Sequence, residues 1–142
     1  MSFNPYLFFS GDCQQAFAFY SRVFGVDAQV MTAGDVPDGM DPMSGAEPHH
    51  VMHASIDLGG SYLMGSDDPT GDTGPKRGIA VSYTAPDPAA AQVTFDNLAE
   101  GGTITLPVSA TFWSPAFGML IDRFGVSWMV DTYPAEDPAA TG

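Results

Sequence analysis

The chain has 142 residues, of which 44% are hydrophobic, and this suits a globular protein with a sizeable core. Its 17 acidic and 4 basic residues give a formal net charge of −13, which disfavours nucleic acid and anionic membranes as partners. A single cysteine excludes an internal disulfide, and we see neither a signal peptide nor a membrane-spanning run, so we expect a cytoplasmic protein.

The first half of the chain predicts one strand, one helix and then three more strands. The strands are runs of β-prone residues between turn residues, whereas the helix has apolar residues at helical spacing. We expect the helix at 12–24 and the strands at 5–9, 27–32, 50–58 and 61–65. Asp12 is the expected N-cap of this helix, and Gly25 is its expected end. The pair Gly59-Gly60 predicts a hairpin turn.

Two long segments rich in glycine, proline and aspartate show no hydrophobic period, which is typical of loops. We expect the segment 33–48 to be a mobile lid over the binding site, whose acidity disfavours anionic ligands. The segment 67–78 is the expected boundary between the two halves of the chain.

The second half predicts the same series of elements. We expect a helix at 87–99 and strands at 79–84, 103–108, 117–122 and 127–132. A proline at the first turn of this helix is well tolerated, because its missing N–H has no partner there in any case. The residues from 134 to 142 are expected to form a disordered tail.

An order of strand, helix and three strands thus occurs twice, which predicts an α+β fold made of two βαβββ units. The units span about 4–67 and 78–133 within a single domain over 1–142, and residues 60–64 match residues 126–130. Each unit is expected to form a curved mixed sheet with a helix on its outer face. The two sheets would then enclose a cup between them.

This pattern, with several short motifs, resembles a known superfamily. The motifs are Pro5–Phe9 with Gly11, Ala16, Phe19-Tyr20, Phe24-Gly25, His53-Ala54, Ser66-Asp67, Phe95–Ala99, Thr111–Trp113, Phe117-Gly118, Asp122–Gly125 and Trp128-Met129. They resemble the vicinal oxygen chelate superfamily of glyoxalase I, extradiol dioxygenases, fosfomycin resistance enzymes and bleomycin-binding proteins, and within it the PhnB-like branch. The stretch from Phe112-Trp113 to Trp128 is the most specific part. The resemblance also implies a homodimer, because relatives commonly assemble in pairs.

PhnB-like sequences are often labelled as 3-demethylubiquinone methyltransferases. Binding of S-adenosylmethionine typically requires a glycine-rich loop after the first strand of a doubly wound sheet. The sequence has no such loop, so we expect no methyl transfer from this chain.

Metal-using members of the superfamily take His, Glu or Gln ligands from the first and last strands of each half. At these positions the chain offers Asp131 as the one plausible ligand, and one carboxylate does not make a site. His49, His50 and His53 are close in sequence, but His50 and His53 point to opposite faces of a strand. We therefore predict no cofactor and no metal ligand, although a divalent metal stays open.

His53 is the candidate for acid–base chemistry, because histidine titrates near neutral pH and the resemblance includes this position. Alternation along the strand places His53, Ser55 and Asp57 opposite Met52, Ala54 and Ile56, and we assign the polar face to the cavity. The expected ligand-binding residues combine aromatic and polar side chains: Phe9, His53, Ser55, Ser82, Phe112, Trp113, Asp122 and Trp128.

For two of the reactive side chains the sequence favours a structural role. Asp122 precedes the turn at Phe124-Gly125, where an aspartate commonly stabilises the backbone. Cys13 falls on a helix face with apolar residues, which favours a buried thiol over a nucleophile.

Three functions remain in competition. The first is a binding protein that holds a small, largely apolar or aromatic molecule in an aromatic-lined cup without a bound metal. The second is a metal-dependent lyase, isomerase or transferase of the glyoxalase type, which rests on the fold alone. The third is a metal-free enzyme with His53 as acid or base. In each case the expected partners are a small molecule and a second copy of the chain, not nucleic acid or a membrane.

Overall fold

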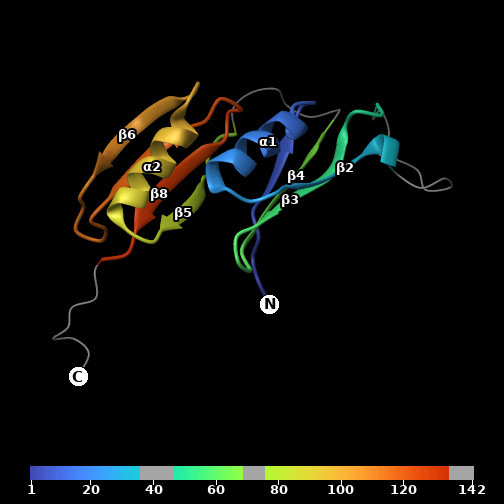
Figure 1. The fold of residues 1–142 in the computed structure, drawn as a ribbon. Helices are drawn as coiled ribbons and strands as arrows, with labels where there is room; N and C mark the ends of the chain where they lie inside the picture. Colours follow the sequence, from blue (N-terminus) through green and yellow to red (C-terminus); the bar gives the residue numbers. More distant parts are fainter. Residues whose placement is uncertain (36–46, 69–75, 135–142) are drawn as a thin grey trace. The chain divides into compact units, whose positions relative to one another are not determined.

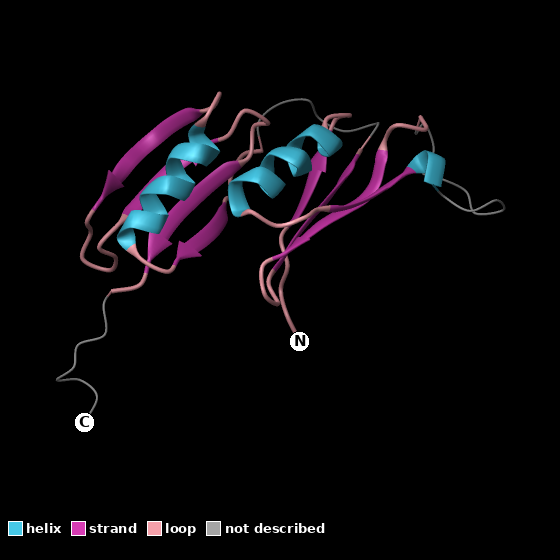
Figure 2. Cartoon of the chain, in the orientation of Figure 1, coloured by secondary structure: helices cyan, strands magenta, loops and turns pink. Residues whose placement is uncertain are grey.

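The computed structural model describes residues 1–35, 47–68 and 76–134. The two helices within these ranges are α1 (Cys13–Phe24) and α2 (Pro88–Ala99), and a short 3-10 helix (Ala33–Asp35) follows β2 (Figures 1 and 2). The strands are β1 (Tyr6–Phe9), β2 (Gln29–Thr32), β3 (Val51–Asp57), β4 (Tyr62–Asp67), β5 (Val81–Ala85), β6 (Thr103–Ser109), β7 (Phe117–Ile121) and β8 (Ser127–Thr132). No helix among the described residues is long and apolar enough to cross a membrane.

The strands form two four-stranded mixed sheets with the same topology. Their orders are β1-β4-β3-β2 and β5-β8-β7-β6. In each sheet the first strand pairs in parallel with the last strand of its unit, while the other pairs are antiparallel. The predicted α+β fold of two βαβββ units is confirmed. The chain divides into two compact units, Met1–Gly74 and Pro75–Gly142.

Each helix packs on one face of its own sheet, and a glycine lies at the contact. A Cβ atom on Gly65 of β4 would lie 2.8 Å from Cε2 of Phe17, a fully buried ring of α1. Likewise, a Cβ atom on Gly118 of β7 would lie 2.7 Å from Cε2 of Phe95 on α2. Such distances are too short for any side chain, so both positions require glycine for the helix to approach the sheet.

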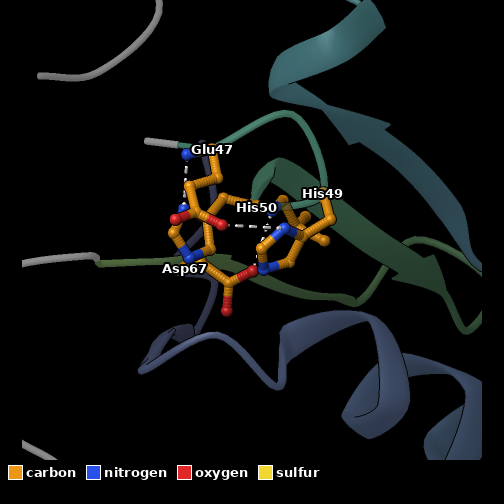
Figure 3. Close-up of polar contacts among 5 residues, drawn as sticks. Glu47, His49, His50 and Asp67 are labelled. Carbon is orange, nitrogen blue, oxygen red and sulfur yellow. Dashed lines mark hydrogen bonds and ion pairs between the residues drawn. The ribbon is translucent and has the colours of Figure 1, made fainter. Parts of the chain in front are cut away.

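A residue that the sequence places in a loop, Asp67, is in fact the last residue of β4. It pairs with Phe9 of β1, and only 1% of its surface is exposed. Its carboxylate accepts hydrogen bonds from the backbone N–H groups of Gly11 (2.9 Å), Cys13 (3.0 Å) and Val51 (2.8 Å). The predicted end of this strand at residue 65 is therefore wrong, because β4 continues to Asp67. The Asp67 carboxylate, drawn in Figure 3, joins the starts of α1 and β3 to β4.

The same carboxylate takes over a role expected of Asp12. Asp12 occupies the N-cap position of α1, but its side chain makes no capping hydrogen bond. The N–H of Cys13 is instead bound by Asp67, which is distant in sequence. The second helix begins as predicted, because the Asp87 side chain accepts a hydrogen bond from the N–H of Ala90. Gly25 also ends α1 as predicted, in the left-handed conformation.

One strand departs from strict alternation. The register of β2 on β3 shifts, so that Met31 pairs with His53 whereas Thr32 pairs with Val51. Met52 is the extra residue of this irregularity and is half-buried, whereas Val51 and Ala54 are both fully buried. The assignment of Met52 to the helix-packed face therefore needs correction, since the shift gives that place to Val51.

The two units also align differently from the sequence match. The last strands β4 and β8 have six residues each, so Tyr62 corresponds to Ser127 and Leu63 to Trp128. Leu63 and Trp128 are both buried. The expected match of residues 60–64 with 126–130 is thus wrong by one residue. An error of one residue exchanges the two faces of a strand.

We predict that Asp67→Asn lowers the free energy of unfolding by about 1–3 kcal/mol, because an amide cannot accept all three N–H groups. Urea unfolding followed by circular dichroism measures this loss. The matched control is Asp12→Asn, which removes a carboxylate at the same helix end and should change stability by less than about 0.5 kcal/mol. Equal losses from the two variants would show that Asp67 does not hold these segments together.

Candidate functional site

The face of the first sheet opposite α1, here called the first open face, carries aromatic and polar side chains. Residues paired across neighbouring strands lie on the same face, which places these side chains together: Tyr6, Phe8, Met31, His53, Ser55 and Met64. The Tyr6 ring lies 5.3 Å from the ring of Phe8 and 5.7 Å from the imidazole of His53, centroid to centroid. The Tyr6 hydroxyl is 3.2 Å from His53 Nδ1, within hydrogen-bond distance.

Burial distinguishes the two faces of β3. Ala54 and Ile56 are buried, whereas His53 is exposed and Ser55 is half-buried. His53 thus lies on the first open face, and its partner Tyr6 comes from the other side of β4. The tyrosine was not among the expected site residues. The alternation of the apolar run Tyr6–Phe9 does not reveal which of its residues face the helix.

The other two histidines lie just before β3 and interact with Glu47. The N–H of Glu47 donates to Nδ1 of His50 at 2.8 Å, and His49 Nδ1 lies 3.4 Å from a carboxylate oxygen of Glu47 (Figure 3). Their rings are 4.5 Å apart, centroid to centroid. These contacts fix the segment that leads into β3. They also engage the Nδ1 atom of each imidazole with Glu47.

The face of the second sheet opposite α2, here called the second open face, has its own polar pair. Thr84 of β5 is paired with Asp131 of β8, and the Thr84 hydroxyl donates to Oδ1 of Asp131 at 2.7 Å. Phe117 of β7 is paired with Asp131 on the other side. The same register places further side chains on this face, among them Ser82, Leu106, Met119 and Met129.

Three aromatic rings form a continuous series that ends on this face, here called the aromatic ladder. Trp113 lies 4.7 Å from Phe112 and 5.2 Å from Phe117 between ring centroids, with edge-to-face geometry in both contacts. Phe117 is buried, whereas Trp113 is 47% exposed and Phe112 is 97% exposed. The ladder therefore extends from the sheet, next to Asp131, into solvent.

The turn that carries Trp113 is fixed to the sheet. The N–H of Thr111 donates to the carbonyl of Ser114, and the N–H of Ser114 donates to the Thr111 hydroxyl. The buried Ser114 hydroxyl also accepts a hydrogen bond from the N–H of Thr132, the last residue of β8. Ser114, the residue after Trp113, thus binds this turn to Thr132, the residue after Asp131.

Three of the expected ligand-binding residues are buried within their own unit: Phe9, Asp122 and Trp128. Phe9 is in edge-to-face contact with Phe17 of α1, at 6.3 Å between centroids, and so faces the helix. Trp128 also faces its helix, and its indole N–H donates to Oδ2 of Asp122 at 2.9 Å. Asp122 further accepts from two backbone N–H groups of the following turn, at Phe124 and Val126. These contacts give Phe9, Asp122 and Trp128 roles in packing and in the turn.

The remaining expected residues fall on the two open faces or beside them. His53 and Ser55 lie on the first open face, and Ser82 lies on the second. Phe112 and Trp113 form the outer part of the aromatic ladder. Of the expected lid, residues 36–46 lie outside the described part of the chain.

The first strands of both units offer no ligand of the kind that metal-using members of the superfamily take from them. The open-face positions of β1 and β5 hold Tyr6, Phe8, Ser82 and Thr84, none of which is His, Glu or Gln. Within residues 1–35, 47–68 and 76–134 no three His, Cys, Asp or Glu side chains group as metal ligands. Asp131 alone does not provide the donor set that a divalent ion requires.

The one thiol is likewise unsuited to nucleophilic chemistry. Cys13 is fully buried, and burial raises the pKa of its thiol far above the ordinary value, with smaller contributions from the charges of Asp67 and Asp12. Since the thiolate is the reactive species, Cys13 is a packed core residue at the start of α1.

Comparison with known proteins agrees with this architecture. A model of the family described as 3-demethylubiquinone-9 3-methyltransferase matches residues 1–131. The structure of protein PA1353 from Pseudomonas aeruginosa is 36% identical, with a TM-score of 0.82 over 94% of this chain and 98% of that one. A putative 3-demethylubiquinone-9 3-methyltransferase, PhnB protein, from Bacillus cereus is 24% identical, with a TM-score of 0.70 over 93% and 99%.

A more distant structure shares the fold alone. The glyoxylase/bleomycin resistance protein/dioxygenase domain from Frankia sp. EAN1pec is 12% identical, with a TM-score of 0.66 over 96% of this chain and 95% of that one. The predicted resemblance to the glyoxalase and bleomycin-resistance fold, and to PhnB, is confirmed.

We predict that His53→Ala changes the free energy of unfolding by less than about 1 kcal/mol, because His53 is exposed. The matched control on the same strand is Ile56→Ala, which should cost about 2–5 kcal/mol, because it leaves a cavity under α1. Urea unfolding of both variants gives the comparison. If His53→Ala were the more destabilising, the faces of β3 would be exchanged.

Proposed function

Because the chain belongs to the PhnB-like family described as 3-demethylubiquinone-9 3-methyltransferase, we propose that it binds a small, largely aromatic molecule on its second open face. The observation that carries this proposal is the aromatic ladder, since two of its rings are exposed and its third ring, Phe117, is paired with Asp131 of the polar pair. Exposed aromatic rings that adjoin a few placed polar groups are typical of ligand sites.

The polar pair gives the site a means of orienting its ligand. Oδ1 of Asp131 is engaged by the Thr84 hydroxyl, and Asp131 is only half-buried, so the carboxylate is accessible from the open face. A ring of the ligand would stack against Trp113, while its polar substituent would meet Asp131. Aromatic stacking supplies most of the binding energy, and the polar contact selects the orientation.

The rigidity of the turn at Thr111–Ser114 also supports binding. A ring held in place before the ligand arrives loses little conformational freedom on binding. The Ser114 hydroxyl, which accepts from the N–H of Thr132, provides this support.

Methyl transfer, which the family description names, is not part of the proposal. Each sheet of this chain is a four-stranded mixed sheet. Nucleotide-like cofactors bind at the strand ends of doubly wound parallel sheets, where a glycine-rich turn meets a helix N-terminus.

A second candidate function, acid–base catalysis at His53, is favoured by the contact between Tyr6 and His53 on the first open face. A hydrogen bond at Nδ1 fixes the orientation of the imidazole and leaves Nε2 to exchange a proton. Solvent deuterium exchange into pyruvate and hydroxyacetone, followed by proton NMR, tests this activity. His53→Gln should abolish exchange above the buffer rate, and Tyr6→Phe should slow it. Equal exchange rates for the parent protein and His53→Gln would exclude this function for these compounds.

For the binding function we predict that naphthylmethanol, a neutral aromatic alcohol, shifts the indole N–H signal of Trp113 in a proton–nitrogen NMR spectrum. The chain has two tryptophans, so the buried Trp128 indole, which donates to Asp122, serves as the internal control and should not move. Trp113→Phe assigns the signals and should weaken binding. A shift of the Trp128 signal alone, or of neither signal, would contradict binding on the aromatic ladder.

A further inference from the structure

We propose that the ligand of the second open face carries a positive charge, either as an alkylammonium group joined to an aromatic ring through a methylene or as an aryl amidinium group. This inference rests on the binding function proposed above and adds the chemical class of the ligand. It starts from the distribution of charge over the strands.

No lysine or arginine lies in any of the eight strands that the structure describes. The charged residues of these strands are Asp57, Asp67 and Asp131. Asp67 is buried and bound by three backbone N–H groups, and Asp57 accepts from the N–H of Gly60 at the hairpin turn. Asp131 is therefore the charge that the second open face offers to a ligand.

The four basic residues of the chain lie elsewhere. Arg22 is on α1, with its guanidinium 5.9 Å from the ring centre of Phe19, and Arg123 lies in the turn after β7, 3.4 Å from a carboxylate oxygen of Glu100. Lys76 and Arg77 precede β5. Among the described residues, Asp131 has no ion pair with any of them. A half-buried carboxylate without a basic partner favours a cation that arrives with the ligand.

The aromatic ladder favours the same charge. The face of an indole attracts cations through its quadrupole, and tryptophan is the best side chain for this contact. Phe117, which contacts Trp113, is paired directly with Asp131, so the ladder and the carboxylate are adjacent on the sheet. An ammonium group joined to the ligand's ring through a methylene would lie next to the aromatic ladder and the Asp131 carboxylate at once.

An anionic ligand would be repelled by the same charges. Its charge would face Asp131, and the formal net charge of −13 would add a long-range repulsion. The Thr84 hydroxyl already donates to Asp131, so it is not available to an incoming carboxylate.

Three compounds with one ring system and different charges test the inference: naphthylmethylamine, naphthylmethanol and naphthylacetate. Their dissociation constants are measured on the full chain by titration of the Trp113 indole signal. We expect the amine to bind about tenfold more tightly than the alcohol, as one charge-assisted hydrogen bond implies, and the acetate to bind most weakly. High salt should reduce the advantage of the amine.

Asp131→Asn identifies the responsible group, because the amide oxygen still accepts from Thr84 while the charge is lost. The amine and the alcohol should then bind within about twofold of each other. The control is Asp96→Asn on the exposed side of α2, which changes the net charge equally and should preserve the tenfold preference. An unchanged Trp128 indole signal shows that each variant is folded.

The outcomes show separately whether the charge inference fails or the binding function fails. Equal affinities of the amine and the alcohol for the parent protein would overturn the charge inference and leave the binding function in place. Equal effects of Asp131→Asn and Asp96→Asn would also overturn it, because the preference would then come from net charge alone. If none of the three compounds shifts the Trp113 signal, the binding function fails and the charge inference fails with it.

Discussion

The contact between a phenylalanine ring and a sheet glycine determines how each unit is built. Phe17 of α1 lies on Gly65, and Phe95 of α2 lies on Gly118, at distances that leave no room for a side chain on the sheet. The ring occupies the volume that a side chain would fill, so the helix lies close to the strands along its length. Because a sheet has two faces, this contact also determines which residues remain on the other face.

The residues that remain on the open faces differ in chemistry from those beneath the helices. Beneath the helices lie aliphatic and aromatic side chains, together with buried polar groups such as Asp67 and Asp122, which satisfy backbone or indole N–H groups. On the open faces lie a tyrosine with a histidine in the first unit, and a threonine with a carboxylate in the second. The buried polar groups Asp67 and Asp122 thus already have partners within their own unit, which is why we propose that a ligand contacts the polar groups of the open faces.

The sequence predicted the elements and their repetition well, because turn residues and hydrophobic periodicity are local signals. The sequence predicted less well which side chains of each strand face the helix. The run Tyr6–Phe9 has no polar residue to mark its solvent side, and Phe9 was expected in the ligand site although it faces α1. The register shift at Met52 and the long-range hydrogen bonds of Asp67 arise from pairing between distant segments. Such pairing has no signature in the local sequence. Phe112 and Trp113, the outer rings of the aromatic ladder, were expected at the ligand site, whereas the third ring, Phe117, was not.

The second open face, with the aromatic ladder and Asp131, is the proposed binding site for a small aromatic molecule. A crystal structure of the protein with naphthylmethylamine tests it most directly. We expect the naphthalene ring to lie against Trp113 and the nitrogen to lie within hydrogen-bond distance of the Asp131 carboxylate. A well-occupied ligand on another surface, with Trp113 and Asp131 left in contact with solvent, would exclude the second open face as the binding site.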